Sequence, residues 1–367
     1  MRLILTGDDF FLQRHSGLIA QLGKWRHTVV LPKIDERKLL KNRIKRRLGL
    51  SDTPDLRNPR AFIESSAVMA DQIKEVARPG DLVLHLFSSF APCTGQALFV
   101  PGKRPPYFFY LDFTMAQALE QWPSWAIFSK VEAKNLWLEV EEEAYRGAVG
   151  ILTMSEGTRD SLIERYGVPS EKIEVVSSGV NDPGQRQRRC GDRSLRFLCD
   201  GSDPLRKGED RAVAFLRSYK RSGRSAELFV LGSPEISLQD DINRVGRLAH
   251  REVQSLLSEC DVLLGLARCD PYPTLVLEAS SHGVVPIVST ESGLAPLISR
   301  IDECLVVNCS ESAEEHSDLF EKIGSLEHLN YLSEKTYEWF LTENEWNVVG
   351  RRIIDALTRM SASLEPS

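Results

Sequence analysis

Two carboxylates with the spacing of a ligand site, Asp270 and Glu278, flank a proline-broken turn at 271–273. The turn leads into apolar residues and then a Gly-Val-Val-Pro-Ile-Val run at 283–288, a pattern that predicts loop, buried helix and buried strand. Asp270 is thus expected at the carboxyl end of a strand and Glu278 near a helix start. In an open parallel sheet, ligands bind in the crevice outside these strand ends. A carboxylate there can accept two hydrogen bonds from a vicinal diol of ribose or hexose. The same spacing also fits an ordinary βαβ unit with two solvated acids.

A second candidate site is the loop that follows the predicted strand 195–199. It runs from Gly201 to Lys207-Gly208 and enters a helix around 212–219. A helix N-terminus and an ammonium group both favour a phosphate, so Lys207 is a candidate anion ligand. The alternative is a helix entry with solvated charges.

Length and composition limit the class of protein. The chain has 367 residues, which suits two domains, and its 42% apolar and 27% charged residues are typical of a globular protein. The net charge of −6 gives no overall basic field and argues against nucleic acid as a partner. The 7 cysteines form no Cys-x-x-Cys pair, which argues against a disulfide framework or zinc site and for a reducing compartment. The N-terminal residues are not typical of a signal peptide, and no apolar run approaches the ~20 residues needed to cross a bilayer, so the expected location is cytoplasmic.

The first half of the chain alternates apolar runs with loops. Strands are predicted at 3–5, 28–31, 82–87 and 107–111, and the last two place His85 and Asp112 near strand carboxyl ends. For His85 alone, a satisfied core histidine is the more common case. Asp112, which follows aromatic and aliphatic residues, favours a functional role. Gly17, before a predicted helix at 18–22, either admits a phosphate to the backbone N–H groups or is a helix-start glycine.

A basic segment at 37–48 places Leu40, Ile44 and Leu48 on one helical face with cations on the others. Such a helix can lie on an anionic membrane, where each cation adds roughly 1 kcal/mol of attraction. It can equally pack its apolar residues on the domain. Val131 to Tyr145 is predicted to be an acidic helix with a solvated face.

Order and turn chemistry over 148–181 carry a family resemblance. A strand at 148–154 precedes Ser155, which is expected to cap a helix, and then come Tyr166-Gly167-Val168-Pro169, a strand at 172–176 and Gly179-Val180. This succession resembles the last βαβ unit of the N-terminal domain in retaining family-4 glycosyltransferases. Asp270 and Glu278 resemble that family's acidic-x7-acidic signature, and Gly201 with Lys207-Gly208 resembles its diphosphate loop.

The resemblance implies a GT-B fold: an α/β protein with two Rossmann-like domains facing each other across a cleft. The expected domains are 1–182 for the acceptor and 195–340 for the nucleotide-sugar donor, joined by a polar linker at 183–194. The segment 341–367, with a helix at 348–360, is expected to return to the first domain. Trp339 and Trp346 are expected to be packing residues.

The implied activity is retaining transfer of a hexose from a nucleoside-diphosphate sugar to a saccharide, lipid-linked or other glycan acceptor, as in surface polysaccharide or glycoconjugate biosynthesis. Asp270 would orient the sugar, Glu278 the ribose and Asp112 the acceptor hydroxyl, with His85 on the acceptor side. The donor would contact Gly17, Gly201, Arg206, Lys207, Arg247, Leu248, Asp270, Thr274, Glu278, Ser292 and Gly293. No cofactor and no metal are expected, because the chain has no Asp-x-Asp motif. The basic segment 37–48 would provide peripheral contact with the inner face of a membrane.

Three positions of the predicted donor domain depart from the family pattern. Ser202 replaces an arginine, Asp270 replaces a glutamate, and Leu297 stands where an acid is usual; Leu111 also replaces a common histidine. These departures motivate an alternative, a non-catalytic GT-B-like protein that binds a nucleotide sugar or a partner. Lys207 and Glu278 count against it. A nucleotide-sugar epimerase is a weaker alternative, because no matching set of acids and a histidine is recognisable.

Overall fold

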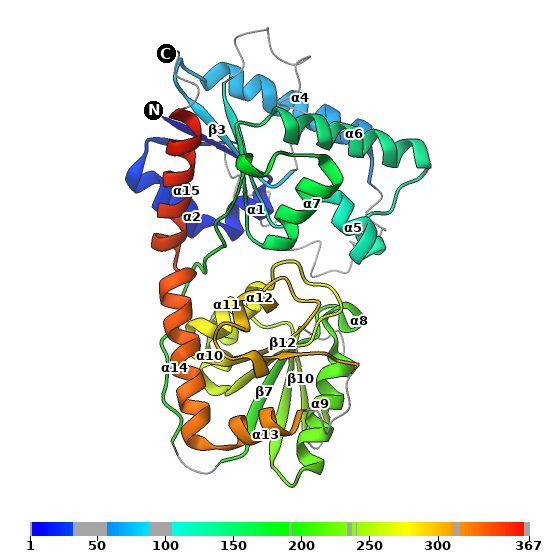
Figure 1. Ribbon diagram of the computed structural model, residues 1–367, viewed down its shortest axis with the longest axis vertical. Helices are drawn as coiled ribbons and strands as arrows, with labels where there is room; N and C mark the ends of the chain where they lie inside the picture. The colour runs from blue at the N-terminus through cyan, green and yellow to red at the C-terminus, as the bar shows by residue number, and fades with distance from the viewer. Residues whose placement is uncertain are drawn as a thin grey trace. The chain divides into compact units, whose positions relative to one another are not determined.

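The computed structural model describes residues 2–31, 57–88, 105–190, 193–232, 237–239, 241–310 and 316–362 (Figure 1). It divides into a first unit, Met1–Asn181 with Trp346–Ser367, and a second unit, Asp182–Glu345. The segment predicted to be a linker, 183–194, therefore lies in the second unit, and the chain returns to the first unit at Trp346 rather than at 341. The basic segment 37–48 lies outside the described residues.

The first unit is built on a six-stranded parallel sheet in the order β2-β1-β3-β4-β5-β6. Its strands are short apolar runs, and every residue of β3 and β4 is buried, as expected for a parallel sheet covered on both faces. The strands are β1 (Leu3–Thr6), β2 (Thr28–Leu31), β3 (Leu82–Leu86), β4 (Tyr107–Leu111), β5 (Gly150–Thr153) and β6 (Ile173–Val175). All six predicted strands of this half are thus confirmed, with ends shifted by up to two residues.

The helices of the first unit cover this sheet: α1 (Asp9–Arg14), α2 (Ser16–Trp25), α4 (Pro59–Val76), α5 (Met115–Gln121), α6 (Val131–Gly147), α7 (Glu156–Tyr166) and α15 (Trp346–Ala362). The side chain of Ser155 caps α7 by accepting from the Thr158 N–H, and Gly167 ends the helix in the left-handed conformation, as predicted. The last helix, α15, packs against α2 (Figure 1). Trp346, at its start, is buried and its indole N–H donates to Asn181 Oδ1 at 3.1 Å.

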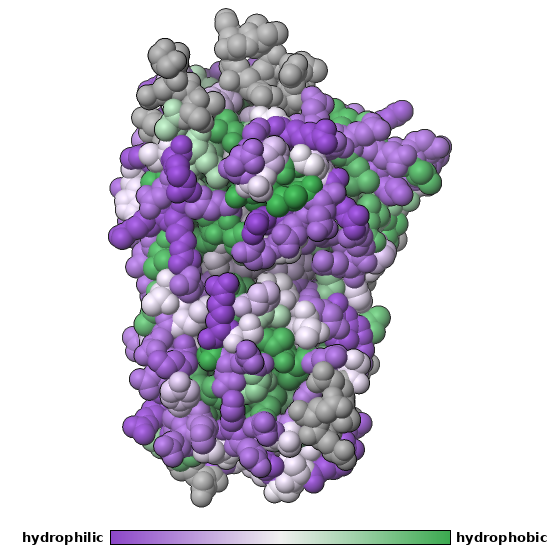
Figure 2. Space-filling model, viewed as in Figure 1, coloured by the Kyte–Doolittle hydropathy of each residue, from purple (hydrophilic) through white to green (hydrophobic). Residues whose placement is uncertain are grey.

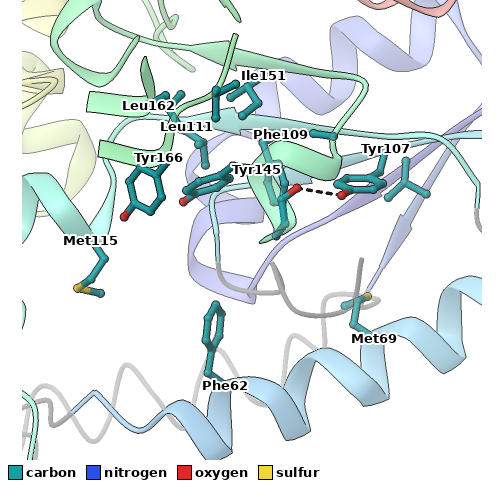
Figure 3. Close-up of a cluster of buried hydrophobic side chains, with 14 of the residues drawn as sticks. Phe62, Met69, Tyr107, Phe109, Leu111, Met115, Tyr145, Ile151, Leu162 and Tyr166 are labelled. Atoms are coloured by element: carbon teal, nitrogen blue, oxygen red, sulfur yellow. Dashed lines mark hydrogen bonds between the residues drawn. The ribbon is translucent and has the colours of Figure 1, made fainter. Parts of the chain in front are cut away.

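The core of the first unit includes one face of α6. This helix was predicted to be acidic with a solvated face and has one, but its other face buries Trp137, Glu141 and Tyr145, which was not predicted. The ring of Trp137 stacks on Phe62 of α4 with centroids 4.0 Å apart. Figure 3 shows Phe62 reaching from α4 toward the phenol rings of Tyr145 and Tyr166. The acidic positions of α6 alternate with core positions, because a helix turns each face only every third or fourth residue.

The second unit is built on a seven-stranded sheet in the order β13-β12-β11-β7-β8-β10-β9. Its strand pairs are parallel except for β9 with β10. The strands are β7 (Leu195–Asp200), β8 (Ala226–Leu231), β9 (Ser237–Gln239), β10 (Ile242–Gly246), β11 (Val262–Gly265), β12 (Val285–Ser289) and β13 (Val306–Val307). The helices are α8 (Pro204–Lys207), α9 (Glu209–Arg221), α10 (His250–Glu259), α11 (Thr274–Ser281), α12 (Ala295–Ile298), α13 (Ser317–Gly324) and α14 (Leu326–Glu343).

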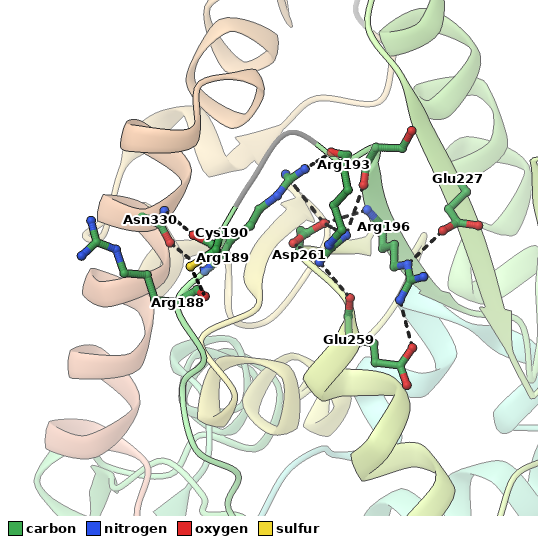
Figure 4. A network of polar contacts seen from close by, with 10 residues as sticks. Arg188, Arg189, Cys190, Arg193, Arg196, Glu227, Glu259, Asp261 and Asn330 are labelled. Carbon is green, nitrogen blue, oxygen red and sulfur yellow. Dashed lines mark hydrogen bonds and ion pairs between the residues drawn. The ribbon is translucent and has the colours of Figure 1, made fainter.

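Polar contacts fasten the segment 182–194 to the second unit (Figure 4). Arg193 forms two hydrogen bonds to the carboxylate of Asp261, at 2.8 and 2.9 Å. The Arg189 N–H donates to Asn330 Oδ1 of α14 at 3.0 Å. A chain held in this way on one side belongs structurally to that unit, although its composition is that of a linker.

The surface in Figure 2 is mostly hydrophilic, with hydrophobic residues in small patches. Within the described part of the chain, no helix combines the length and apolar character needed to span a bilayer.

Candidate functional site

The second sheet has a topological switch point between β7 and β11. From β7 the chain runs outward through β8 and β10 on one side, and β11, β12 and β13 occupy the other side. Ligands of open α/β sheets bind outside the strand carboxyl ends at such a point, because the two connections diverge there and leave a crevice. The loop after β7 carries Lys207 and the loop after β11 carries Asp270, so the sheet order brings both predicted residues to this position.

Lys207 and Asp270 are in direct contact. The Nζ atom of Lys207 lies 2.7 Å from Asp270 Oδ2 and 2.9 Å from Asp200 Oδ2. We call Asp200, Lys207 and Asp270 the ion cluster. Burial lowers the pKa of Lys207, but the attraction of Asp270 and Asp200 outweighs it and raises the pKa above its ordinary value. Burial also raises the pKa of Asp200, but Lys207 outweighs that effect and lowers it. Lys207 and Asp200 are therefore both charged near neutral pH.

Backbone conformation directs Lys207 toward this crevice. Asp203 caps the short helix α8, whose last residue is Lys207, and Gly208 then adopts a φ of +73°. A Cβ added at Gly208 would lie 2.1 Å from the Leu266 carbonyl oxygen, so only glycine fits between the two loops. The required glycine explains the Lys-Gly order that the sequence shows.

The side chain of Arg206 contacts the loops that follow β7 and β11. Its guanidinium group donates to Asp203 Oδ2 at 3.0 Å and to the Cys269 carbonyl oxygen at 2.9 Å. These contacts join the β7 and β11 loops and fix the backbone beside Asp270. In this conformation Arg206 acts as a brace, whereas it was predicted to contact the donor.

The loop after β12 closes the site from the other side. Asp270 pairs with Ser292 in an isolated bridge, and the Gly293 N–H donates to the Asp270 carbonyl oxygen at 2.9 Å. A Cβ on Gly293 would lie 1.8 Å from the Pro271 carbonyl oxygen. The predicted Ser292-Gly293 turn therefore contacts the loop that carries Asp270.

The remaining predicted donor residues lie at the same edge of the sheet. Thr274 and Glu278 are half-buried and share one face of α11, one helical turn apart. Gly201 directly follows β7. Arg247, which is exposed, and Leu248 follow the carboxyl end of β10. Asp200 was not predicted, although its sequence signal was present: an acid that ends a strand directly before a glycine loop.

Gly17 lies in the first unit. Its backbone N–H donates to Asn181 Oδ1 at 2.9 Å. A Cβ at this position would lie 2.2 Å from Trp346 Cδ1. The predicted access of a phosphate to this N–H is therefore closed in this conformation, and packing explains the glycine.

His85 is part of the core of the first unit. Its side chain is 1% exposed, and its Nδ1 atom lies 2.6 Å from Thr6 Oγ1. Burial lowers its pKa to about 3, so the ring is neutral. The prediction of an acceptor-side histidine does not fit this position, whereas a satisfied core histidine does.

Asp112 lines a cavity of about 820 Å³ in the first unit. The cavity lies at the switch point of the first sheet, between β1 and β3, where Phe11 and Phe87 follow the two strand ends. Most of its wall is aromatic or aliphatic, and Glu141 of α6 reaches it from the buried side. We call it the aromatic cavity. Glu141 was not predicted, because its helix has a solvated pattern.

Comparison with known proteins agrees with this architecture. Sucrose-phosphate synthase from Thermosynechococcus elongatus has a TM-score of 0.66 at 14% identity, with 99% of this chain and 100% of that chain covered. A glycosyltransferase from Rickettsia africae has a TM-score of 0.64 at 13% identity, with 100% of this chain and 99% of that chain covered. The N-terminal domain of Candida albicans trehalose-6-phosphate phosphatase has a TM-score of 0.63 at 15% identity, with 97% and 96% covered. The fold is GT-B, the fold of glycosyltransferases.

A family model agrees with the predicted resemblance. Residues 17–182, less than half of the chain, match the model of Glycosyltransferase Family 4, which confirms that resemblance. No curated protein sequence matches the chain. Family and fold together support a glycosyltransferase.

Proposed function

We propose that this protein is a retaining glycosyltransferase that transfers a hexose from a nucleoside-diphosphate sugar to a saccharide, lipid-linked or other glycan acceptor. The observation that carries the proposal is the ion cluster. Lys207 lies at the switch point of an open α/β sheet, in contact with Asp270, and Glu278 lies on the following helix α11. A cation for the diphosphate and carboxylates for the hydroxyl groups are what a nucleotide sugar requires.

Lys207 would stabilise the leaving diphosphate. Negative charge develops on the diphosphate as the bond from the sugar C1 to its phosphate oxygen breaks, and a fixed cation in a partly buried site lowers the energy of that state. Because Asp200 and Asp270 both pair with Lys207, the diphosphate would compete with these carboxylates for the ammonium group. Asp270 would then turn to the sugar hydroxyls and Glu278 would hold the ribose diol.

Retention needs no protein nucleophile. The acceptor oxygen forms its bond to C1 on the face that the phosphate leaves, and the phosphate oxygen takes the acceptor proton. Asp112, in the aromatic cavity, would orient the acceptor hydroxyl. We further propose that the transfer is independent of metal, because Lys207 supplies the charge that a cation would otherwise provide.

The fold neighbours support this choice of substrates. One is a trehalose-phosphate synthase described as UDP-forming, and another such enzyme is described in complex with glucose-6-phosphate. A nucleotide sugar and a saccharide acceptor are therefore the substrate classes that we extend to this chain.

A non-catalytic nucleotide-sugar-binding protein is the alternative, and we do not favour it. The three departures from the family pattern leave Lys207 and Glu278 in place, and Asp270 keeps its charge within contact distance of Lys207. Surface polysaccharide synthesis, a cytoplasmic location and membrane contact through 37–48 remain predictions.

The test is a transfer assay with UDP-, GDP- and ADP-hexoses and a panel of saccharide and lipid-linked acceptors. Release of nucleoside diphosphate that depends on acceptor, with the anomeric configuration of the donor kept in the product by NMR, is the expected result. Activity should survive EDTA. Stoichiometric nucleotide binding without acceptor-dependent release would favour the non-catalytic alternative, and an inverted product would refute retention.

A further inference from the structure

The aromatic cavity has the size and lining of a small-molecule site. Its volume of about 820 Å³ falls within the range of roughly 300–1,000 Å³ typical of ligand pockets. Phe11, Phe62, Phe113, Trp125 and Trp137 contribute aromatic surface from five separate segments of the first unit. Such walls favour flat apolar groups and the C–H faces of sugar rings.

One side of the cavity carries buried polar atoms that lack hydrogen-bond partners. Glu141 Oε1 and Trp137 Nε1 belong to residues that line the cavity, and Tyr145 lies one turn further along α6. Among the residues that the structure describes, Glu141 Oε1, Trp137 Nε1 and Tyr145 Oη form no hydrogen bond of good geometry, although Trp137 and Ser88 lie beside the carboxyl group. A buried polar group without a well-placed partner is unfavourable, so a ligand that completes its hydrogen bonds is favoured.

Glu141 has a fixed position and a raised pKa. Its Oε2 atom accepts a hydrogen bond from Tyr166 Oη at 2.6 Å, and its side chain is 0% exposed. Burial raises the pKa of Glu141, and hydrogen bonds from Tyr166, Trp137 and Ser88 offset this only in part. A carboxyl group accepts from a hydroxyl group, and its protonated form, which burial favours, can also donate.

Backbone strain at the rim is a further sign of function. Phe87, directly after β3, has a φ of +63°, a strained conformation that bulky side chains avoid. Its ring stacks on Phe11 with centroids 3.8 Å apart, so the strained residue completes the aromatic wall.

We propose that the aromatic cavity binds a glycoside with an apolar aglycone, and that Glu141 hydrogen-bonds to a hydroxyl group of its sugar. The aglycone would pack against the aromatic wall. This assignment names the acceptor class of the proposed transferase and in that sense rests on the proposed function, but the binding requires no donor and no turnover.

The test is calorimetric titration of the full-length protein, without nucleotide, with phenyl β-glucoside and with octyl β-glucoside below its micelle concentration. Glucose is the control for the sugar half of the ligand, and benzyl alcohol is the control for the apolar aglycone. Both glycosides should bind at one per chain and at least tenfold more tightly than either control. Preference between phenyl and octyl would distinguish an aryl from a lipid-like aglycone. Equal or absent binding of glycosides and controls would overturn the proposal.

Variants separate ligand binding from packing. Glu141→Leu should weaken the glycosides at least tenfold, whereas Glu141→Gln, which can still donate and accept, should keep affinity within about threefold of wild type. Glu143→Gln, at an exposed position of the same helix, should change nothing. If Glu141→Leu does not fold, Ala61→Trp replaces it, since Ala61 lines the cavity from an exposed position on α4 and a large ring there would block it. Unchanged affinity in Ala61→Trp would overturn the proposal.

The two proposals can fail separately. Binding of nucleotides without binding of glycosides would refute the cavity assignment and leave the transferase intact. Binding of glycosides without any nucleotide would keep the cavity assignment and refute the donor site.

Discussion

At the junction of β7 and β11 the second unit gathers charged side chains, whereas at the junction of β1 and β3 the first unit gathers aromatic ones. The two positions are equivalent, because each is the switch point of a parallel sheet. Sheet topology thus determines where a site forms, and the loops that follow the strands determine its chemistry. We propose a diphosphate as the ligand of Lys207 in the ion cluster and an apolar ring or chain as the ligand of the aromatic cavity.

The strongest test of this contrast is Lys207→Ala. Loss of the only cation of the ion cluster should lower turnover roughly 10²- to 10³-fold, as is typical when a group that stabilises a developing charge is removed. Initial rates of nucleoside diphosphate release measure it. Lys220→Ala removes a lysine from an exposed ion pair with Asp241 and should leave the rate unchanged. Equal rates in both variants would contradict a role for Lys207.

Lowering the pH should destabilise the first unit through the protonation of His85. Burial lowers the pKa of His85 to about 3 in the folded protein. The unfolded chain, in which the pKa of this histidine is near 6.5, therefore takes up a proton first as the pH falls. The stability that the neutral ring contributes is complete above pH 6.5 and is lost as the pH falls toward 3. The loss is about 1.4 kcal/mol per pH unit. Glu141, whose pKa burial raises, opposes this trend, and His15, whose pKa burial lowers to about 4, adds to it.

The variant His85→Gln isolates the contribution of His85 to the pH dependence of stability. Urea unfolding between pH 6.5 and 4.5 should give a slope of stability against pH that is smaller than that of wild type by about 1.4 kcal/mol per unit. His328→Gln, at an exposed position of α14, is the control. Identical slopes in wild type and His85→Gln would mean that His85 is not a buried neutral residue.

Gly17→Ala tests whether this glycine serves packing or phosphate binding. The new methyl group would lie 2.2 Å from Trp346 Cδ1, so we expect a loss of about 1–3 kcal/mol in unfolding free energy with nucleotide affinity unchanged. Gly23→Ala in the same helix meets nothing within 4 Å and should stabilise the protein by up to about 1 kcal/mol. Weaker nucleotide binding by a stable Gly17→Ala would restore its predicted donor role.

Glu278→Gln should weaken a nucleoside diphosphate about tenfold, because a hydrogen bond to a charged group contributes about 1.5–3 kcal/mol. The loss should disappear with the 2′,3′-dideoxy nucleotide, which has no ribose diol to bind. Calorimetry on both nucleotides measures the difference. A tenfold loss with the dideoxy nucleotide as well would place Glu278 elsewhere than at the ribose.

The smallest expected effect is that of Asp200→Asn. Removing one of the two carboxylates that compete for Lys207 should tighten nucleoside diphosphate binding about fivefold, because a partly exposed ion pair contributes up to about 1 kcal/mol. Weaker binding would mean that Asp200 orients the lysine rather than competing for it.

The sequence predicted the ion-cluster side better than the cavity side. Apolar runs predicted β7, β11 and β12, and turn chemistry identified Lys207 and Asp270, since these signals lie within short stretches. The partnership of Lys207 with Asp200 was missed, because it depends on which strand ends lie side by side. Glu141 was missed for a related reason: its place among Trp137, Tyr145 and Tyr166 arises only when α4 and α6 pack together.

Arg206 and His85 show the opposite limit. The family resemblance implied a phosphate ligand at Arg206 and an acceptor-side histidine at His85, although for His85 alone a core histidine was the more common case. The brace to Cys269 and the contact with Thr6 follow from neighbours distant in the chain. Helix α4, which the sequence analysis did not assign, supplies one wall of the aromatic cavity.

The measurement that tests the donor site most directly is hydrogen exchange of the full-length protein with and without UDP, GDP and ADP. One of the three should protect the loops 200–208, 266–273 and 289–294 together, because all three converge on the ion cluster. Protection should be absent in Lys207→Ala. If none of these nucleotides protects the three loops in wild type, or if protection appears only elsewhere in the chain, the ion cluster is not a nucleotide site.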